Sequence, residues 1–163
     1  MVSVFNGGFI MCLTKLVVNP DSQNLKKRRV FKLVKVVKYD NDIKSIESVF
    51  NQYEWISGKH KSSRETKEIE KYEDFTGKVF KGFHVFFDRK TAEHEALDMH
   101  QDGWGHLYIL ACTAYGKDYV CEGEWDDTTV NCAVYTDLTV EKREYERTLQ
   151  QHNKVKKETL ECV

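Results

Sequence analysis

The stretch that decides the fold is VFKGFHVFFDRKTAEHEALDMHQDGWGHLYILAC, residues 79–112. Its first part, residues 79–87, is rich in valine and phenylalanine, which favour strands. Residues 91–101 place Ala92, Ala96 and Met99 on one face at helical spacing, and residues 107–112 form a second apolar run. We therefore expect a strand, a helix and a second strand. If both strands lie parallel in one sheet, the helix is a right-handed crossover.

Weaker patterns lie on both sides of this unit. Residues 30–38 carry enough β-branched side chains to favour a strand, whereas residues 44–50 carry a weak helical pattern. The polar run at 57–72 predicts an exposed loop or hairpin tip. Residues 118–121 and 129–135 predict a hairpin closed by an acidic loop at 122–127, and the chain from 140 onward predicts a charged helix.

Together these elements predict an α+β fold. We expect a small mixed, mainly antiparallel sheet, one crossover helix over about residues 90–101 and a charged C-terminal helix. A chain of 163 residues fits one domain and can bury a sizeable core. We place a single α+β domain at residues 1–140 and a charged helix or tail at 141–163.

Composition indicates a soluble protein of the cytoplasm. Hydrophobic residues make up 40% of the chain, and no apolar run approaches the roughly 20 residues that span a bilayer. The N-terminal residues have no basic leader and no cleavage site of small residues, so we expect no signal peptide. Five cysteines, an odd number without Cys-x-x-Cys spacing, are typical of free thiols in a reducing compartment.

Basic and acidic side chains gather in different segments. The net charge of −1 gives the whole molecule no long-range attraction for nucleic acid. Within the basic segment, which runs from Lys26 to Lys38, we take Arg28, Arg29 and Lys32 as candidate ligand-binding residues. With nearby aromatic rings they could form a surface for single-stranded nucleic acid, and the alternative is a solvated edge strand that lysines protect from aggregation. The two segments comprise Lys26, Lys27, Arg28, Arg29, Lys32, Lys35 and Lys38, and then Asp118, Glu122, Glu124, Asp126 and Asp127.

His84 is the candidate site residue of the first strand. Its neighbours on both strand faces are apolar, which predicts a central strand, and Gly82 leaves backbone open beside it. A buried imidazole needs a hydrogen-bond partner. His84 is therefore either paired within the core or used to bind a ligand.

Metal and cofactor sites are not predicted. His94 and Asp98 are i, i+4 neighbours on the solvent side of the expected helix, but two ligands do not make a site and the His-Glu-x-x-His pattern is absent. The common glycine-rich nucleotide loops and the Gly-x-Ser-x-Gly elbow are also absent.

One short acidic motif suggests an enzyme. Glu122-Gly123-Glu124 resembles the Glu-x-Glu element of arginine-directed ADP-ribosyltransferases, in which a glutamate orients the nicotinamide ribose of NAD. The Ser-Thr-Ser strand motif of that family is missing from this chain. The alternative is that these glutamates belong to a solvated turn.

Three further motifs resemble a group of small uncharacterised phage and bacterial proteins. These are Met-Cys-Leu-Thr from Met11, Val-Phe-Lys from Val30 and Gly-Phe-His from Gly82. In that group a serine often follows Gly-Phe-His, where this chain has Val85, so the resemblance does not imply a shared polar site. It implies a small α+β domain from a mobile genetic background, where such proteins often bind and block host or defence factors.

We therefore expect a non-enzymatic binding protein, a phage-encoded accessory or anti-defence factor. Its expected partner is a host or defence protein, and a nucleotide or nucleic acid is the other ligand class considered. An ADP-ribosyltransferase-like enzyme that uses Glu122 and Glu124 is the alternative.

Overall fold

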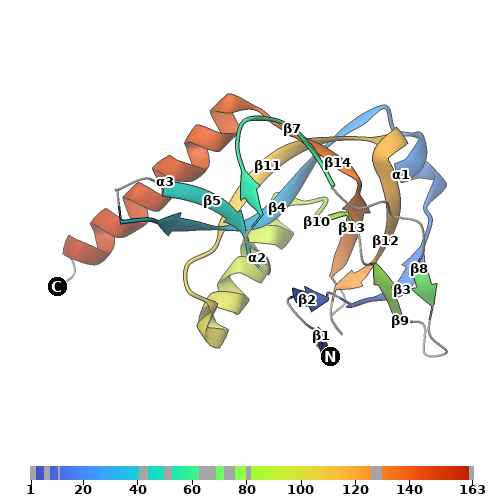
Figure 1. Ribbon diagram of the computed structural model, residues 1–163, viewed down its shortest axis with the longest axis horizontal. Helices are drawn as coiled ribbons and strands as arrows, with labels where there is room; N and C mark the ends of the chain where they lie inside the picture. Colours follow the sequence, from blue (N-terminus) through green and yellow to red (C-terminus); the bar gives the residue numbers. More distant parts are fainter. Residues whose placement is uncertain are drawn as a thin grey trace.

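Two six-stranded antiparallel sheets form the body of the protein (Figure 1). The computed structural model describes residues 3–5, 8–10, 12–40, 44–49, 53–62, 69–71, 76–79, 82–125 and 130–161. One sheet has the order β10 (Phe83–Val85), β13 (Asn131–Tyr135), β12 (Tyr119–Trp125), β3 (Cys12–Val17), β9 (Thr76–Val79) and β8 (Ile69–Lys71). The other has the order β6 (Glu54–Trp55), β5 (Lys44–Ser48), β4 (Lys27–Lys38), β11 (Tyr108–Tyr115), β14 (Asp137–Val140) and β7 (Gly58–Lys61).

Helices and one small hairpin complete the described structure. The hairpin pairs β1 (Ser3–Phe5) with β2 (Gly8–Ile10). The helical segments are α1 (Pro20–Asn24), α2 (Arg89–Met99), a π-helical turn at His100–Trp104, a 3-10 turn at Gly116–Asp118 and α3 (Lys142–Glu161). The α+β class and the antiparallel pairing are thus confirmed.

At two places among the described residues the two sheets are joined with no helix or turn between them. Thr136 alone separates β13 in one sheet from β14 in the other. On the opposite side Phe86, which follows β10, exchanges both backbone hydrogen bonds with Phe31 of β4, at 2.8 and 2.9 Å. Strands β4, β11, β14, β13 and β10 therefore form a closed circuit of backbone connections.

Strand β4 carries the core on both of its faces. Val30 and Val34 belong to one buried cluster, with Trp55 and Tyr135, while Phe31 and Leu33 belong to a second. β4 pairs with β5 on one side and β11 on the other, so the prediction of a basic edge strand is wrong.

Helix α2 forms where the sequence predicts it. The Asp88 side chain accepts a hydrogen bond from the Thr91 backbone N–H at 3.2 Å and caps the first turn, and Ala92, Ala96 and Met99 are buried as expected. The helix does not cross between parallel strands. It connects β10 in one sheet to β11 in the other, so the parallel arrangement of these two strands is wrong.

Helix α3 confirms the expected charged C-terminal helix. It lies against the sheet that contains β11, as Figure 1 shows. Tyr145, Leu149 and Val155 pack on the core, and the buried Thr148 hydroxyl donates to the Ile109 carbonyl at 3.1 Å. Of the helices in the described residues, none is long and apolar enough to cross a membrane.

Four local predictions are corrected. Residues 44–48 form strand β5 rather than a helix, because pairing with β4 outweighs the weak helical pattern. Within the polar run, Gly58–Lys61 forms β7, which pairs with β14. Strand β12 extends to Trp125 and contains Glu122 and Glu124, which the sequence suggested for a loop, because inward side chains alternate along it. β10, expected to be central, is the last strand of its sheet.

Parts of several predictions lie outside the described residues. They concern Met11 of the first motif, Ile43 and Phe50 of the expected helix, residues 63–68 and 72 of the polar run, Phe80 and Lys81 of the first strand, Asp126 and Asp127 of the acidic segment, and Cys162.

Candidate binding site

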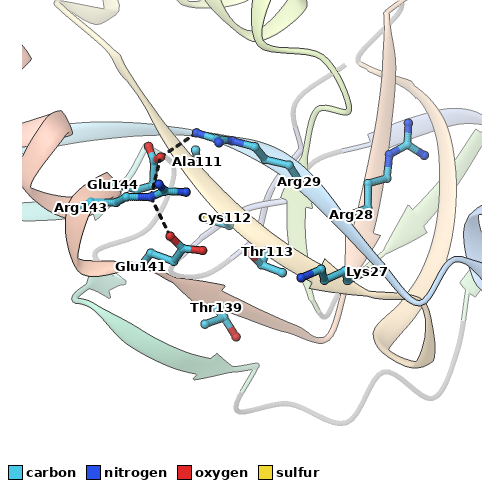
Figure 2. A pocket seen from close by; sticks show the side chains of 10 residues that line it. All are labelled: Lys27, Arg28, Arg29, Ala111, Cys112, Thr113, Thr139, Glu141, Arg143 and Glu144. Carbon is cyan, nitrogen blue, oxygen red and sulfur yellow. Dashed lines mark hydrogen bonds and ion pairs between the residues drawn. The ribbon is translucent and has the colours of Figure 1, made fainter.

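A small basic pocket lies where α3 begins above β4, β11 and β14 (Figure 2). Its volume is about 200 Å³. The start of β4 contributes three consecutive cations, Lys27, Arg28 and Arg29, and the first turn of α3 with the residue before it contributes Glu141, Arg143 and Glu144. Strand pairing brings these segments together although more than a hundred residues separate them in the sequence.

Two of the arginines are held by carboxylates. Arg29 and Glu144 form an ion pair at 2.7 Å, and Arg143 and Glu141 form one at 2.8 Å. Glu144 is buried and also lies 3.8 Å from Arg143 and 3.6 Å from Arg147. Figure 2 shows the first four side chains as one linked row. Two of the three arginines that line the pocket are thus paired with carboxylates at the start of the helix.

The remaining polar groups of the pocket come from the strands. Thr113 and Thr139 are cross-strand partners of β11 and β14, and both line the pocket. The Arg28 guanidinium lies 3.6 Å from the centre of the Phe87 ring, a cation–π contact that turns it away from the ion-paired row (Figure 2). Lys27 is exposed.

Cys112 also lines the pocket, beneath these polar groups. Its side chain is buried, and burial raises the pKa of the thiol to about 12 although the charge of Lys32 acts in the opposite direction. A thiol with such a pKa is not ionised at neutral pH. Cys112 therefore forms part of the floor of the pocket and does not act as a nucleophile there.

The structure separates the predicted ligand-binding residues into two groups. Arg28 and Arg29 line the pocket, whereas Lys32 and His84 do not. Lys32 donates from Nζ to the His84 backbone carbonyl at 3.0 Å. The Nε2 atom of His84 is buried and has no hydrogen-bond partner among the described residues.

Lys32 and His84 occupy a desolvated region between β4 and β10. Burial lowers the pKa of Lys32, and burial followed by the positive charge of Lys32 lowers the pKa of His84 to about 3. His84 is therefore neutral at physiological pH. The Lys32 ammonium supplies a donor to β10 near the Phe31–Phe86 bridge, which is a structural role for this side chain.

Glu122 and Glu124 lie apart from the pocket. Both are half-buried and alternate with inward side chains on β12, so they lie on the same face of that strand. Glu122 accepts a hydrogen bond from the Ser22 hydroxyl of α1 at 3.4 Å. Neither glutamate is among the residues that line the pocket.

A group of three possible metal ligands lies on α2. One ligand atom each from His94, Glu95 and Asp98 lies within 4.8 Å of the others. His94 Nδ1 and Asp98 Oδ2 are 3.4 Å apart and both side chains are largely exposed, as the sequence predicts. Glu95 is buried, and burial, together with the charge of Asp98, raises its pKa. Sequence analysis did not find Glu95 as a third member.

Most pocket residues were not predicted from the sequence. No motif marks the other charged and polar residues of the pocket, and the strand pairing that brings them to β4 cannot be read from their spacing; they are Thr113, Thr139, Glu141, Arg143 and Glu144.

The fold and the pocket define an α+β protein with a small basic surface site. Comparison of the chain with protein-family models, with curated proteins and with solved structures gave no match.

Proposed function

We propose that the protein acts by binding another protein, with the basic pocket as the centre of its contact surface. The observation that carries this proposal is the pair of arginines, Arg29 and Arg143, held in place by Glu144 and Glu141 at the mouth of a small pocket. Arginine side chains that are already positioned lose less freedom on binding, and arginine is enriched at protein interfaces.

The size of the pocket supports a protein partner over a small ligand. Pockets that enclose a drug-sized ligand measure roughly 300–1,000 Å³. The pocket of about 200 Å³ is large enough for one side chain or one acidic group of a partner but not for a complete dinucleotide. The ADP-ribosyltransferase alternative gains no support from this pocket, because neither Glu122 nor Glu124 lines it.

The resemblance to small phage and bacterial proteins supports a host or defence protein as the partner. Under that resemblance the protein is a phage-encoded accessory or anti-defence factor that works in the cytoplasm of a bacterial host. Its partner is then a host or defence protein that presents acidic groups to the basic pocket.

Affinity capture with matched variants tests this proposal. Immobilised wild-type protein is compared with Lys27→Glu, which reverses an exposed charge in the pocket, and with Lys90→Glu, which reverses an exposed charge on α2 outside the pocket. Wild type and Lys90→Glu should retain the same host protein, and Lys27→Glu should lose it. Thermal unfolding of all three proteins checks that each is folded.

Two results would contradict the proposal. If the wild type retains no host protein, the proposed binding function is refuted. If Lys27→Glu retains the host protein as well as the wild type does, the pocket is not part of the contact surface. The enzyme alternative is tested in the same lysate with labelled NAD. Label transfer by the wild type that is lost in Glu124→Gln would replace binding by ADP-ribosylation.

A further inference from the structure

We infer that His94, Glu95 and Asp98 of α2 form a binding site for a divalent transition-metal ion such as Zn²⁺. The site is separate from the basic pocket, because none of the three residues lines that pocket, and it does not depend on the proposed function. Two observations carry the inference. The three ligand atoms lie close together, and Glu95 is a buried carboxylate with no hydrogen bond or ion pair among the described residues.

The positions of the three residues on α2 bring their side chains to one side of the helix. Asp98 follows His94 by four residues and Glu95 by three, the spacings at which helical side chains meet. One ligand atom of each residue lies within 4.8 Å of the others. His94 Nδ1 and Asp98 Oδ2 are 3.4 Å apart, close to the separation of about 3.3 Å between two ligands of a tetrahedral zinc ion. Joint binding of one ion therefore requires no more than a small shift of the Glu95 carboxylate.

Glu95 distinguishes this group from an ordinary surface ion pair. A solvated pair explains His94 and Asp98, which are largely exposed, but it does not explain a third carboxylate that is only 7% exposed. Buried carboxylates are costly unless they are paired or coordinate a metal. Burial, followed by the charge of Asp98, raises the pKa of Glu95, so the two carboxylates repel each other here. A bound cation would offset both the repulsion and the cost of burial.

The ligand types select the kind of metal. Mg²⁺ and Ca²⁺ prefer sites made only of oxygen atoms, whereas an imidazole nitrogen suits zinc and its neighbours among the transition metals. Two carboxylates beside a neutral imidazole also balance the charge of a divalent ion. Three protein ligands leave at least one position of a tetrahedral zinc ion open. Because His94 and Asp98 are exposed, this position is accessible to water or to a ligand atom of another molecule.

NMR titration of the chelator-treated protein with Zn²⁺ tests the inference, because it reports binding at individual residues. We expect saturable one-to-one binding that shifts the His94 imidazole signals and the amide signals of α2, whereas Mg²⁺ at the same concentration should leave the imidazole unshifted. Affinity should fall at least about tenfold in His94→Gln and in Glu95→Gln, because each substitution removes a ligand. Glu93→Gln and His100→Gln make the same chemical changes at exposed positions outside the group and should keep the wild-type affinity.

Thermal unfolding gives a second measurement on Glu95→Gln. Without metal this variant should unfold at a higher temperature than the wild type, because an unpaired buried charge is removed. Zn²⁺ should raise the unfolding temperature of the wild type more than that of the variant. A packing role of Glu95 alone would give the opposite result, a less stable variant with unchanged zinc affinity.

Three other results would also overturn the inference. The first is the absence of a saturable shift of the His94 imidazole in the wild type. The second is an equal response of that imidazole to Mg²⁺, which would show a non-selective acidic surface. The third is loss of zinc binding in His100→Gln but not in His94→Gln, which would place the ion at the stacked rings of His100 and His106.

Discussion

The neutral His84 makes the stability of the protein depend on pH in a predictable direction. Its pKa in the folded protein is about 3, against 6.5 as the ordinary value. Below pH 6.5 the unfolded chain takes up a proton that the folded protein does not, so stability falls as the pH decreases towards 3. Each pH unit in this window costs at most about 1.36 kcal/mol. Between about pH 6.5 and 4.5 the loss amounts to at most roughly 2 kcal/mol, since the unfolded imidazole is only half protonated at the upper pH and the folded imidazole retains partial exposure.

The substitution His84→Gln isolates this contribution. Glutamine is polar but does not titrate, so the variant should lose up to about 2 kcal/mol less stability than the wild type on acidification to about pH 4.5. Carboxylates contribute to both proteins and cancel in the difference. The free energy of unfolding is measured by urea denaturation with tryptophan fluorescence at about pH 7 and pH 4.5. His94→Gln, which removes a largely exposed histidine on α2, is the matched control.

Lys32 provides a second perturbation of the same group. Its charge is the smaller of the two causes that lower the pKa of His84, after burial. In Lys32→Met the pKa of His84 should therefore rise part of the way towards 6.5, which NMR titration of the imidazole measures directly. Equal acid sensitivity of wild type and His84→Gln, or an imidazole of the wild type that titrates near 6.5, would refute this explanation.

Two further substitutions test the packing. Ser48→Ala removes the hydroxyl that accepts a hydrogen bond from the buried Trp55 indole N–H at 2.8 Å, and should lower the free energy of unfolding by roughly 1–3 kcal/mol. Ser57→Ala, on the exposed surface, should change that free energy by less than about 0.5 kcal/mol. Equal effects of the two substitutions in urea denaturation would contradict this prediction. Gly116→Ala would place a Cβ against the backbone carbonyls of Gln23 in α1 and of Leu25 after it, and should cost more than about 2 kcal/mol. Gly103→Ala, which has open space but a φ of 92°, should cost about 1 kcal/mol. A smaller loss for Gly116→Ala in thermal unfolding would show that the chain accommodates the methyl group.

Local signals in the sequence were sufficient to predict the main elements. The β-branched run at 30–38 became β4, and the helical spacing of Ala92, Ala96 and Met99 became the buried face of α2. The two runs around the acidic segment became the paired strands β12 and β13. In each case the residues that form the pattern also form the contacts, so short-range information was enough.

Contacts between distant segments could not be predicted in this way. Strand β5 contains two buried serines, Ser45 after Lys44 and Ser48 after Glu47. Pairing with β4 gives these residues a strand conformation against their weak helical preference. The pocket is a stronger example, because Arg29 and Glu144 are separated by 115 positions. Arg28 and Arg29 could be selected as cations, but the carboxylate that pairs with Arg29, Glu144, belongs to a helix whose position depends on the whole sheet.

Thr136 ties the two sheets into a single mechanical unit. Its N–H donates to the Asp118 carbonyl and its carbonyl accepts from the Ser62 N–H, both at 2.8 Å, so the one residue between β13 and β14 is itself fixed on both sides. The two sheets cannot move relative to each other at this point without breaking these hydrogen bonds, because a single residue connects β13 to β14. Heat or denaturant should therefore unfold both sheets in one cooperative transition.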